Sequence, residues 1–334
     1  MKRILITGAG GFLGARLARS LLATPPSAFN SDFSLTLADQ HPLPPDLSAH
    51  PRVTAAVGPM LQQGELFASG FDGVFHLASA VSGECELDFE LGLRSNLDST
   101  RLLLEGLRRA GNVPRVFFSS SIAVYGPDPA LPLASPVTED TLPAPQTSYG
   151  THKLMCEYLI ADYTRKGFID GRSARLMTVT VRPGQPNGAA SSFFSGILRE
   201  PLAGAPSVCP VDRHVAHPVS SPGTTVASII GVFNAPRELL KRRLAVNLPA
   251  LNVTVAQMLD ALQEVAGQAV RERVVFEHDA RIAGIVANWP QAAAKGTATE
   301  VLGLQADANF ASVIEQYIND MRAHGNAQAL QGLT

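Results

Sequence analysis

The sequence predicts an α/β fold in which helices cover both faces of a parallel, doubly wound β-sheet, with a smaller α/β lobe in the C-terminal half. A short apolar run at residues 3–7 leads into a cluster of glycines and then into a helical pattern. Further apolar runs alternate with amphipathic helical patterns up to about residue 182. Strands and helices that alternate in this way form parallel βαβ units.

The elements of the first half follow in a regular order. The predicted strands are short runs rich in apolar and β-branched residues, at 3–7, 34–38, 73–78, 113–119 and 177–182. The predicted helices have leucines at helical spacing, at 16–22, 96–110 and 149–165.

The second half is organised differently. Pro, Gly and Ser recur after residue 183 to about residue 222. Thr254 is a predicted N-cap for a helix at 255–266, because its hydroxyl can accept from the first turn. A short strand is predicted at 274–276 and a closing helix at 310–324. We therefore assign residues 1–180 to the sheet core and 181–334 mainly to a second lobe, with segments at about 220–248 returning to the core.

The composition is that of a packed globular protein, with 46% hydrophobic and 17% charged residues. The net charge of -2 gives no electrostatic reason to expect nucleic acid or an anionic membrane as partner. The three cysteines lie far apart and the eight histidines are scattered, so no metal site is predicted. No signal peptide is recognised, and no apolar run approaches the ~20 residues that span a bilayer. A cytoplasmic location is expected.

The glycines at the start of the first predicted helix indicate a dinucleotide site. Gly8, Gly11 and Gly14 form a G-x-x-G-x-x-G pattern between the first strand and its helix. Glycine allows the tight turn, the close approach of backbone to a pyrophosphate and the packing of helix on sheet. Phe12 and Leu13 open the helix, whose N-terminal N–H groups face the phosphates. A plain strand-to-helix turn would also use glycine, but the position next to the first strand favours the dinucleotide.

Asp39 stands at the end of the second predicted strand. A carboxylate there accepts hydrogen bonds from the adenosine ribose hydroxyls and repels a 2′-phosphate. Gln40 and His41 follow, so no Lys or Arg is adjacent to receive that phosphate. The sequence therefore predicts NAD rather than NADP, with a solvated turn aspartate as the alternative reading of Asp39.

A Ser–Tyr–Lys set points to proton transfer from an alcohol. Tyr149 and Lys153 are four residues apart at the start of a predicted helix and share one face of it. An ammonium near a phenol lowers the phenol pKa from ~10 toward neutrality. The phenolate then takes a proton from an alcohol as hydride leaves for nicotinamide, and a serine from the run 119–121 orients the same oxygen. An isolated Y-x-x-x-K arises by chance on helix surfaces, but the preceding glycine turn and strand-end acid favour the catalytic interpretation.

Together these motifs resemble the extended short-chain dehydrogenase/reductase superfamily, across nearly the whole chain. TGAGGFLG at 7–14, HLA at 76–78, NLDST at 96–100, SSSIAVYG at 119–126, YGTHK at 149–153 and RPG at 182–184 occur in that family's order. The resemblance implies a Rossmann core, a substrate-binding C-terminal lobe and NAD as cofactor. Ser121 aligns with the catalytic hydroxyl, Tyr149 with the acid/base and Lys153 with the residue that tunes it. The cofactor-binding residues that it implies are Gly8, Gly11, Phe12, Leu13, Gly14, Asp39, Met60, Ala78, Asn96, Tyr149, Lys153 and Pro183.

One departure from the family pattern concerns adenine. Many members have Gly-Asp at the end of the third strand, where this chain has Gly58-Pro59-Met60. In this alignment the aspartate contact is missing, and Met60 is expected to contact adenine instead.

The family resemblance also implies a homodimer that pairs through the helices at 96–110 and 149–165. The apolar residues of these helices that we assign to the dimer contact are Leu103, Leu107, Leu154 and Leu159, although core packing explains some of them equally well.

The substrate has to be inferred from the second half. The stretch 182–204 is rich in small and hydroxyl residues, which suits a compact polar substrate. With 245–259 and Trp289-Pro290 it resembles the branch of the superfamily that oxidises the C2 hydroxyl of D-erythronate with NAD. Candidate substrate-binding residues are Ser79, Ser121, Tyr149, Asn187, Ser191, Ser192, Arg199 and Arg213. A nucleotide-sugar epimerase, dehydratase or reductase is the first alternative, and a non-catalytic NAD(P)-sensing protein is a remote one.

Overall fold

The computed structural model describes residues 1–29, 32–184, 190–240 and 244–333. Its strands are β1 (Lys2–Thr7), β2 (Phe33–Asp39), β3 (Val53–Val57), β4 (Gly73–His76), β5 (Arg115–Ser121), β6 (Asp170–Leu176), β7 (Thr178–Val179), β8 (Ser207–Cys209), β9 (Ala216–Ser220), β10 (Val246–Asn247), β11 (Leu251–Thr254) and β12 (Val274–Phe276). Its longer helices are α1 (Phe12–Ala23), α6 (Ser99–Ala110), α7 (Ser148–Arg165), α8 (Ser192–Leu202), α9 (Pro222–Asn234), α10 (Val255–Ala266) and α14 (Phe310–Ala323). Its short helices are α2 (Pro45–Ser48), α3 (Gly64–Phe67), α4 (Ser82–Leu87), α5 (Phe89–Gly92), α11 (Gln268–Arg271), α12 (Ala280–Val286) and α13 (Thr297–Glu300).

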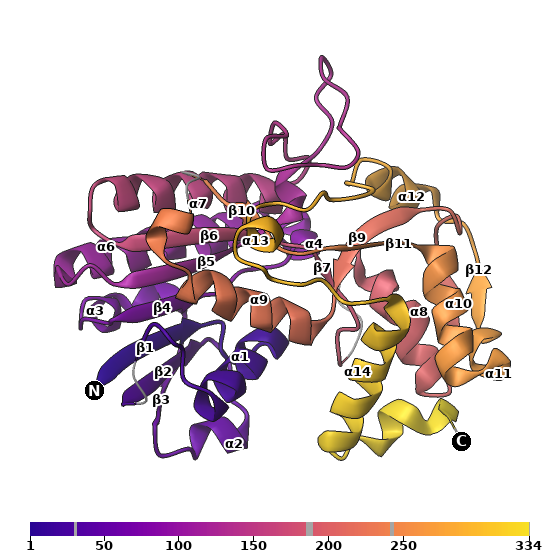
Figure 1. The fold of residues 1–334 in the computed structure, drawn as a ribbon, viewed down its shortest axis with the longest axis horizontal. Coiled ribbons are helices and arrows are strands. Elements are labelled where there is room, and N and C mark those ends of the chain that lie inside the picture. The colour runs from indigo at the N-terminus through magenta and orange to yellow at the C-terminus, as the bar shows by residue number, and fades with distance from the viewer. Residues whose placement is uncertain (30–31, 185–189, 241–243, 334) are drawn as a thin grey trace.

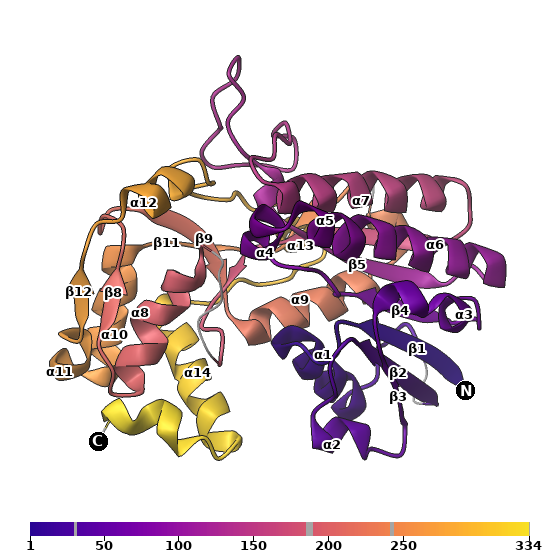
Figure 2. The ribbon, with the colours of Figure 1, turned by 180° about the vertical axis from the view of Figure 1, so that it is seen from behind.

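The main sheet has seven strands in the order β10-β6-β5-β4-β1-β2-β3, and every neighbouring pair is parallel. Helices α1 and α9 lie on one face and α6 and α7 on the other (Figures 1 and 2). Successive residues of β1 divide between these two cores, since Ile4 and Ile6 pack on the first face and Leu5 on the second. The predicted doubly wound Rossmann sheet is confirmed.

The second lobe forms a separate core at the other side of the molecule (Figure 1). Helices α8, α10 and α14 enclose it, together with the small sheets β11-β9-β7 and β12-β8. Helix α10 begins as predicted, because the Thr254 hydroxyl accepts from the Gln257 N–H at 3.2 Å and the Gln257 side chain accepts from the Thr254 N–H at 2.8 Å. Helix α9 and strand β10 return to the main sheet. The domain boundary near residue 180 stays a prediction.

The prediction of a strand at 177–182 is wrong. The core strand is β6, and 177–182 supplies only β7, in a small sheet of the second lobe. Strand β6 contains Arg172 and Arg175, which are charged yet buried. Arg172 donates to the backbone carbonyls of Val232, Phe233 and Ala235 at the end of α9. The two arginines make the sequence of β6 look too polar for a core strand. Partners from distant parts of the chain satisfy them in the folded protein.

A buried ion pair anchors α7 to the sheet. Glu157 accepts from Arg175 through both carboxylate oxygens, at 2.9 and 2.7 Å, and Ser120 also donates to it. Arg175 further donates to the Tyr125 hydroxyl at 2.6 Å. Glu157 lies one turn beyond Lys153, so the pair fixes the helix that supplies the Tyr149 and Lys153 side chains.

In the part of the chain that the structure describes, none of the helices combines the length and apolar character needed to cross a membrane.

Candidate active site

A cavity of about 770 Å³, called here the central cavity, opens where the carboxyl ends of the parallel strands meet the second lobe. Such crevices are where doubly wound sheets bind ligands. Its wall contains the glycine turn, the ends of β2 and β5, residues 77–82, Tyr149 and Lys153 from α7, and Trp289 with Pro290 from the second lobe.

The glycine turn fits a pyrophosphate against backbone. Gly8 has a φ of +70°, and a Cβ there would lie 2.7 Å from the Ala78 nitrogen. A Cβ on Gly14 would lie 2.1 Å from the Gly8 carbonyl oxygen. Only glycine therefore allows this turn and the close packing of α1. Phe12 and Leu13 at the start of α1 line the central cavity, as predicted from sequence.

The Asp39 carboxylate is held at the cavity wall beside this turn. It accepts from the Gly10 N–H at 2.8 Å and from the His41 N–H at 3.0 Å. Met60, which follows β3, lines the same end of the central cavity. Both residues lie where an adenosine contact requires them, and their contacts with the cofactor stay predictions.

Asn96 supports the cavity wall from behind and does not line it. Its side-chain oxygen accepts from the Ala80 N–H at 2.8 Å and the Ser79 hydroxyl at 3.0 Å, and its amide donates to the Ala80 carbonyl at 3.2 Å. Asn96 thus positions the segment 78–80, and the direct cofactor contact expected of it stays a prediction. Ala78 and Ser79 do line the central cavity.

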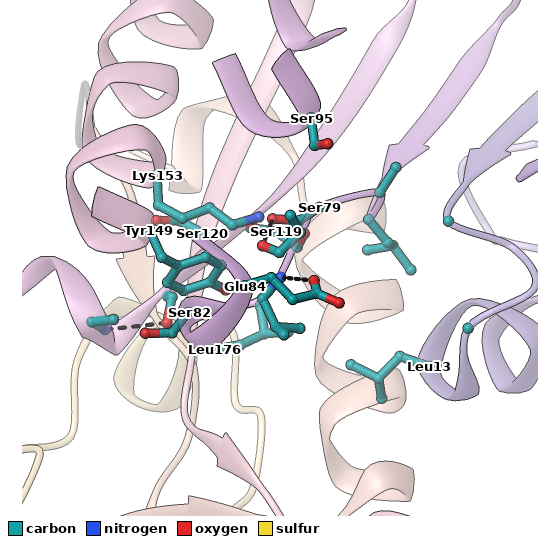
Figure 3. Close-up of a pocket in the computed structure, with 18 of the residues that line it drawn as sticks. Leu13, Ser79, Ser82, Glu84, Ser95, Ser119, Ser120, Tyr149, Lys153 and Leu176 are labelled. Atoms are coloured by element: carbon teal, nitrogen blue, oxygen red, sulfur yellow. Dashed lines mark hydrogen bonds between the residues drawn. The ribbon is translucent and has the colours of Figure 1, made fainter. Parts of the chain in front are cut away.

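Three consecutive serines end β5, and hydrogen bonds separate their roles. Ser119 donates to the His76 carbonyl at 3.1 Å, and Ser120 donates to Glu157. Ser121 accepts from the Ala123 N–H at 3.1 Å and interacts with Tyr149. Ser121 is therefore the serine whose hydroxyl is available to a substrate oxygen. Figure 3 shows Tyr149 and Lys153 extending from α7 beside Ser119 and Ser120.

Lys153 is tied to the scaffold at the base of the site. Its ammonium donates to the Ser119 carbonyl at 2.8 Å and lies 5.5 Å from the centroid of the Tyr149 ring. Burial lowers the pKa of Lys153 to about 8. Burial likewise lowers the pKa of His76 to about 3, and this neutral ring bridges the Thr7 and Thr100 hydroxyls.

The electrostatics of Tyr149 differ from the sequence-based expectation. Burial raises the pKa of its phenol above the ordinary value, while the Ser121 hydroxyl and the charge of Arg182 act in the opposite direction. Arg182 is one cation that favours the Tyr149 phenolate. The lowering expected from Lys153, whose ammonium lies near the ring, stays a prediction.

Arg182 is the cationic group of the substrate-side wall. It donates to the Val179 carbonyl at 3.0 Å and to the Ser191 hydroxyl at 2.9 Å. Both Arg182 and Ser191 line the central cavity. Burial is the main cause that lowers the pKa of Arg182, followed by the charge of Arg199. None of the carboxylates in the described ranges forms an ion pair with Arg182, so the wall presents a desolvated positive charge.

The remaining site residues predicted from sequence do not line the central cavity or lie outside the described residues. Arg199 pairs with Glu200 at 2.6 Å and donates to the Arg182 carbonyl at 3.0 Å, and it does not line the central cavity. Ser192 and Pro183 also do not line it. Arg213 is exposed beyond the small sheet. Asn187 lies outside the described residues.

Sequence reasoning therefore missed the arginine that faces the site. Arg182 belongs to the RPG motif and is the last residue of the strand predicted at 177–182. That position was the available signal, since strand ends meet at the ligand crevice. No comparable signal marked Thr178 or His217, because only the contact between β7 and β9 brings them to the cavity.

Comparisons with known proteins agree with this geometry. The model of the NAD dependent epimerase/dehydratase family matches residues 4–212. D-erythronate dehydrogenase of Cupriavidus necator is 45% identical over 326 residues, which cover 95% of this chain and 98% of the relative. The enzyme of the same name from Haemophilus influenzae is 42% identical over 319 residues, with 95% and 98% covered. A crystal structure described as the nucleoside-diphosphate-sugar epimerase from Agrobacterium tumefaciens matches with a TM-score of 0.87 and 37% identity, covering 96% of this chain and 95% of that one.

Proposed function

Because the chain belongs to the NAD-dependent epimerase/dehydratase family and is an NAD-dependent dehydrogenase, we propose that it oxidises the C2 hydroxyl of D-erythronate. The product of this reaction is 2-dehydro-D-erythronate. The names of the two curated relatives support this substrate, and so does the chemistry of the cavity wall.

The observation that carries the proposal is the Arg182 guanidinium beside Tyr149. Both side chains line the central cavity, and the charge of Arg182 opposes the burial that raises the pKa of Tyr149. A sugar acid oxidised at C2 has its carboxylate one bond from the reacting carbon. A half-buried guanidinium that pairs with none of the described carboxylates suits that carboxylate, because charge-assisted hydrogen bonds replace the water that both ions lose. Ser191, which accepts from Arg182, lies at the same wall.

The proposed chemistry uses four side chains of this chain. Ser121 and Tyr149 contact the C2 hydroxyl, and Tyr149 accepts its proton as the C2–H bond breaks. Arg182 holds the carboxylate and favours the charged form of Tyr149. Lys153 donates to the Ser119 carbonyl and maintains the end of β5 next to Ser121. NAD, when bound, supplies the hydride acceptor.

The residues of the central cavity fit NAD. The glycine turn leaves room for phosphate against backbone, and Asp39 offers carboxylate oxygens next to it. Tyr149 and Lys153 line the other end of the same cavity. The nicotinamide half of the cofactor would lie beside these two residues, with the adenosine half near Asp39 and Met60.

A nucleotide-sugar reaction is the second candidate, because the Agrobacterium structure carries that description. A nucleoside diphosphate needs cationic groups spaced for two phosphates. Arg182 and the exposed Arg94 are the arginines on the cavity wall among the described residues. One half-buried guanidinium suits a single carboxylate better than two phosphates. A non-catalytic sensor is disfavoured because Ser121, Tyr149 and Lys153 are all at the cavity.

The substrate assay decides between these candidates. We expect the purified protein to reduce NAD with D-erythronate at a kcat/KM well above that for UDP-glucose or GDP-mannose. NADH absorbance measures oxidation, and chromatography of UDP-glucose incubations measures 4-epimer formation. Epimerisation without any oxidation of D-erythronate would replace the proposal with the nucleotide-sugar reading. Tight NAD binding without either reaction would favour the sensor.

Asp39 is expected to set the preference for NAD. With the wild type, kcat/KM should be higher for NAD than for NADP, since the carboxylate repels a 2′-phosphate. In Asp39→Ser the ratio should fall by about tenfold or more, because a charged hydrogen bond contributes about 1.5–3 kcal/mol. Asp46→Ser removes an aspartate outside the cavity and should leave the ratio unchanged. Equal or better use of NADP by the wild type would refute this role.

We also propose a homodimer, with a different contact surface from the one first predicted. Leu103 and Leu107 are fully buried in the sheet core and are excluded from it. Exposed apolar side chains instead gather on α7 and on the neighbouring α4 and α5: Met155, Tyr158, Leu87 and Phe89. Exposed apolar patches of this kind mark protein contacts.

The dimer is tested by light scattering at micromolar concentration. The wild type should have the mass of two chains, and the double variant Met155→Glu/Tyr158→Glu should shift to one chain. Val275→Glu changes an equally exposed apolar residue in the second lobe and should remain dimeric. A monomeric wild type would overturn the proposal.

A further inference from the structure

Two residues of the second lobe, Thr178 and His217, are joined by a hydrogen bond at the wall of the central cavity. Thr178 is on β7 and His217 on β9, and these strands pair in parallel. The Thr178 hydroxyl lies 2.7 Å from His217 Nε2, and His217 Nδ1 lies 3.0 Å from the Pro290 carbonyl oxygen. Thr178, His217 and Pro290 all line the central cavity.

The carbonyl at the far end sets the direction of this chain of hydrogen bonds. A carbonyl oxygen only accepts, so Nδ1 of His217 carries a proton. A neutral imidazole has one N–H, and Nε2 is therefore an acceptor. The Thr178 hydroxyl must then donate to Nε2. Because the Thr178 hydroxyl donates its hydrogen to His217, it can only accept a hydrogen bond from a ligand.

The surroundings of His217 keep it neutral and in place. Its ring stacks on Phe194 with centroids 5.1 Å apart and an interplanar angle of 8°, and Trp289 lies 5.4 Å away. Burial lowers the pKa of His217 to about 4, so the ring carries a single N–H proton at neutral pH. The direction of the Thr178 hydrogen bond is therefore the same throughout the neutral range.

We propose that Thr178 is a specificity residue that accepts a hydrogen bond from a hydroxyl of the substrate, and that His217 positions it for this. The inference rests on the proposed function and refines it. A fixed acceptor attracts a hydroxyl and repels a carboxylate, whereas the charge of Arg182 at the same cavity attracts a carboxylate. The wall therefore distinguishes the two ends of a short polyhydroxy acid, and it selects against acids that lack the hydroxyl beyond C2.

The test compares D-erythronate with its 3-deoxy and 4-deoxy analogues, 2,4-dihydroxybutanoate and 2,3-dihydroxybutanoate. In the wild type, loss of the hydroxyl that reaches Thr178 should lower kcat/KM by about tenfold or more, because a buried polar group then stays unpaired. We call the ratio of kcat/KM for D-erythronate to kcat/KM for the deoxy acid the discrimination. In Thr178→Val the discrimination should fall to about twofold or less, mainly through a lower kcat/KM for D-erythronate. Thr178→Ser keeps a hydroxyl and should retain most of the discrimination.

Two further variants separate this role from a structural one. Thr225→Val removes a buried hydroxyl that does not line the central cavity, and should leave the discrimination at its wild-type value. His217→Phe keeps a ring for Phe194 but removes the acceptor, so the discrimination should weaken while the Kd for NAD stays unchanged.

The outcomes separate this inference from the function on which it rests. A wild type that oxidises D-erythronate, with unchanged discrimination in Thr178→Val, would overturn the role of Thr178 and leave the proposed function intact. An equal loss of kcat/KM with all three acids in Thr178→Val would overturn it too. A wild type that oxidises no four-carbon sugar acid would overturn both.

Discussion

Replacement of Tyr149 by Phe is expected to lower kcat by at least about 10²-fold while NAD still binds. The phenol is the proton acceptor in the proposed reaction, and the variant removes only its oxygen. Ser121 and Arg182 both interact with that oxygen, and neither can take its place: Ser121 is a weak base, and the guanidinium stays protonated. Steady-state oxidation of D-erythronate and fluorescence titration of NAD measure the two properties separately.

Tyr158→Phe is the matched control for this variant. Tyr158 belongs to the same helix but its side chain is 55% exposed and lies outside the central cavity. Its kcat should equal that of the wild type. Near-normal turnover in Tyr149→Phe would show that another group takes the proton.

Replacement of Arg182 by Met should lower kcat/KM for D-erythronate by about 10²–10³-fold. Removal of one partner from a desolvated charge pair costs about 2–5 kcal/mol, and each 1.4 kcal/mol is a factor of ten. The variant leaves the substrate carboxylate without its cation and also removes the charge that favours the Tyr149 phenolate. We therefore expect kcat to fall together with the affinity for the acid, while the Kd for NAD stays unchanged.

Arg165→Met and Arg182→Lys provide the controls for the Arg182 prediction. Arg165 is an exposed arginine of α7 that pairs with Asp162, so its removal should leave kcat/KM unchanged. Lysine at 182 keeps the charge but not the planar fork, and should recover part of the activity. If Arg182→Met oxidises D-erythronate as well as the wild type does, the carboxylate is bound elsewhere.

The parts of the site that are local in sequence were predictable. The glycine turn, the acid at the end of β2 and the Tyr149–Lys153 spacing each depend on a few neighbouring residues. Backbone sterics and the period of the helix determine what those residues can do. The same holds for the N-cap at Thr254, whose partner Gln257 is three residues away.

The substrate-binding wall of the cavity was predicted less well, because segments that lie far apart in the sequence form it. Arg199 was a candidate by its charge, but it pairs with Glu200 and does not line the central cavity, whereas Arg182 does. The prediction missed strand β6 because its sequence contains two arginines, and only the folded chain brings them their partners, Asp170 for Arg172 and Glu157 for Arg175.

The sequence by itself determined the parallel sheet and the dinucleotide turn, and it predicted NAD and the Tyr149–Lys153 pair, with the serine left open within 119–121. These follow from short-range patterns, in which side-chain type and spacing suffice. Only the tertiary structure decided that Arg182 faces the cavity, that Asn96 supports the wall from behind, and that His217 directs the Thr178 hydroxyl. Each of these depends on which partners burial brings within hydrogen-bond distance, and residues far apart in the chain supply them.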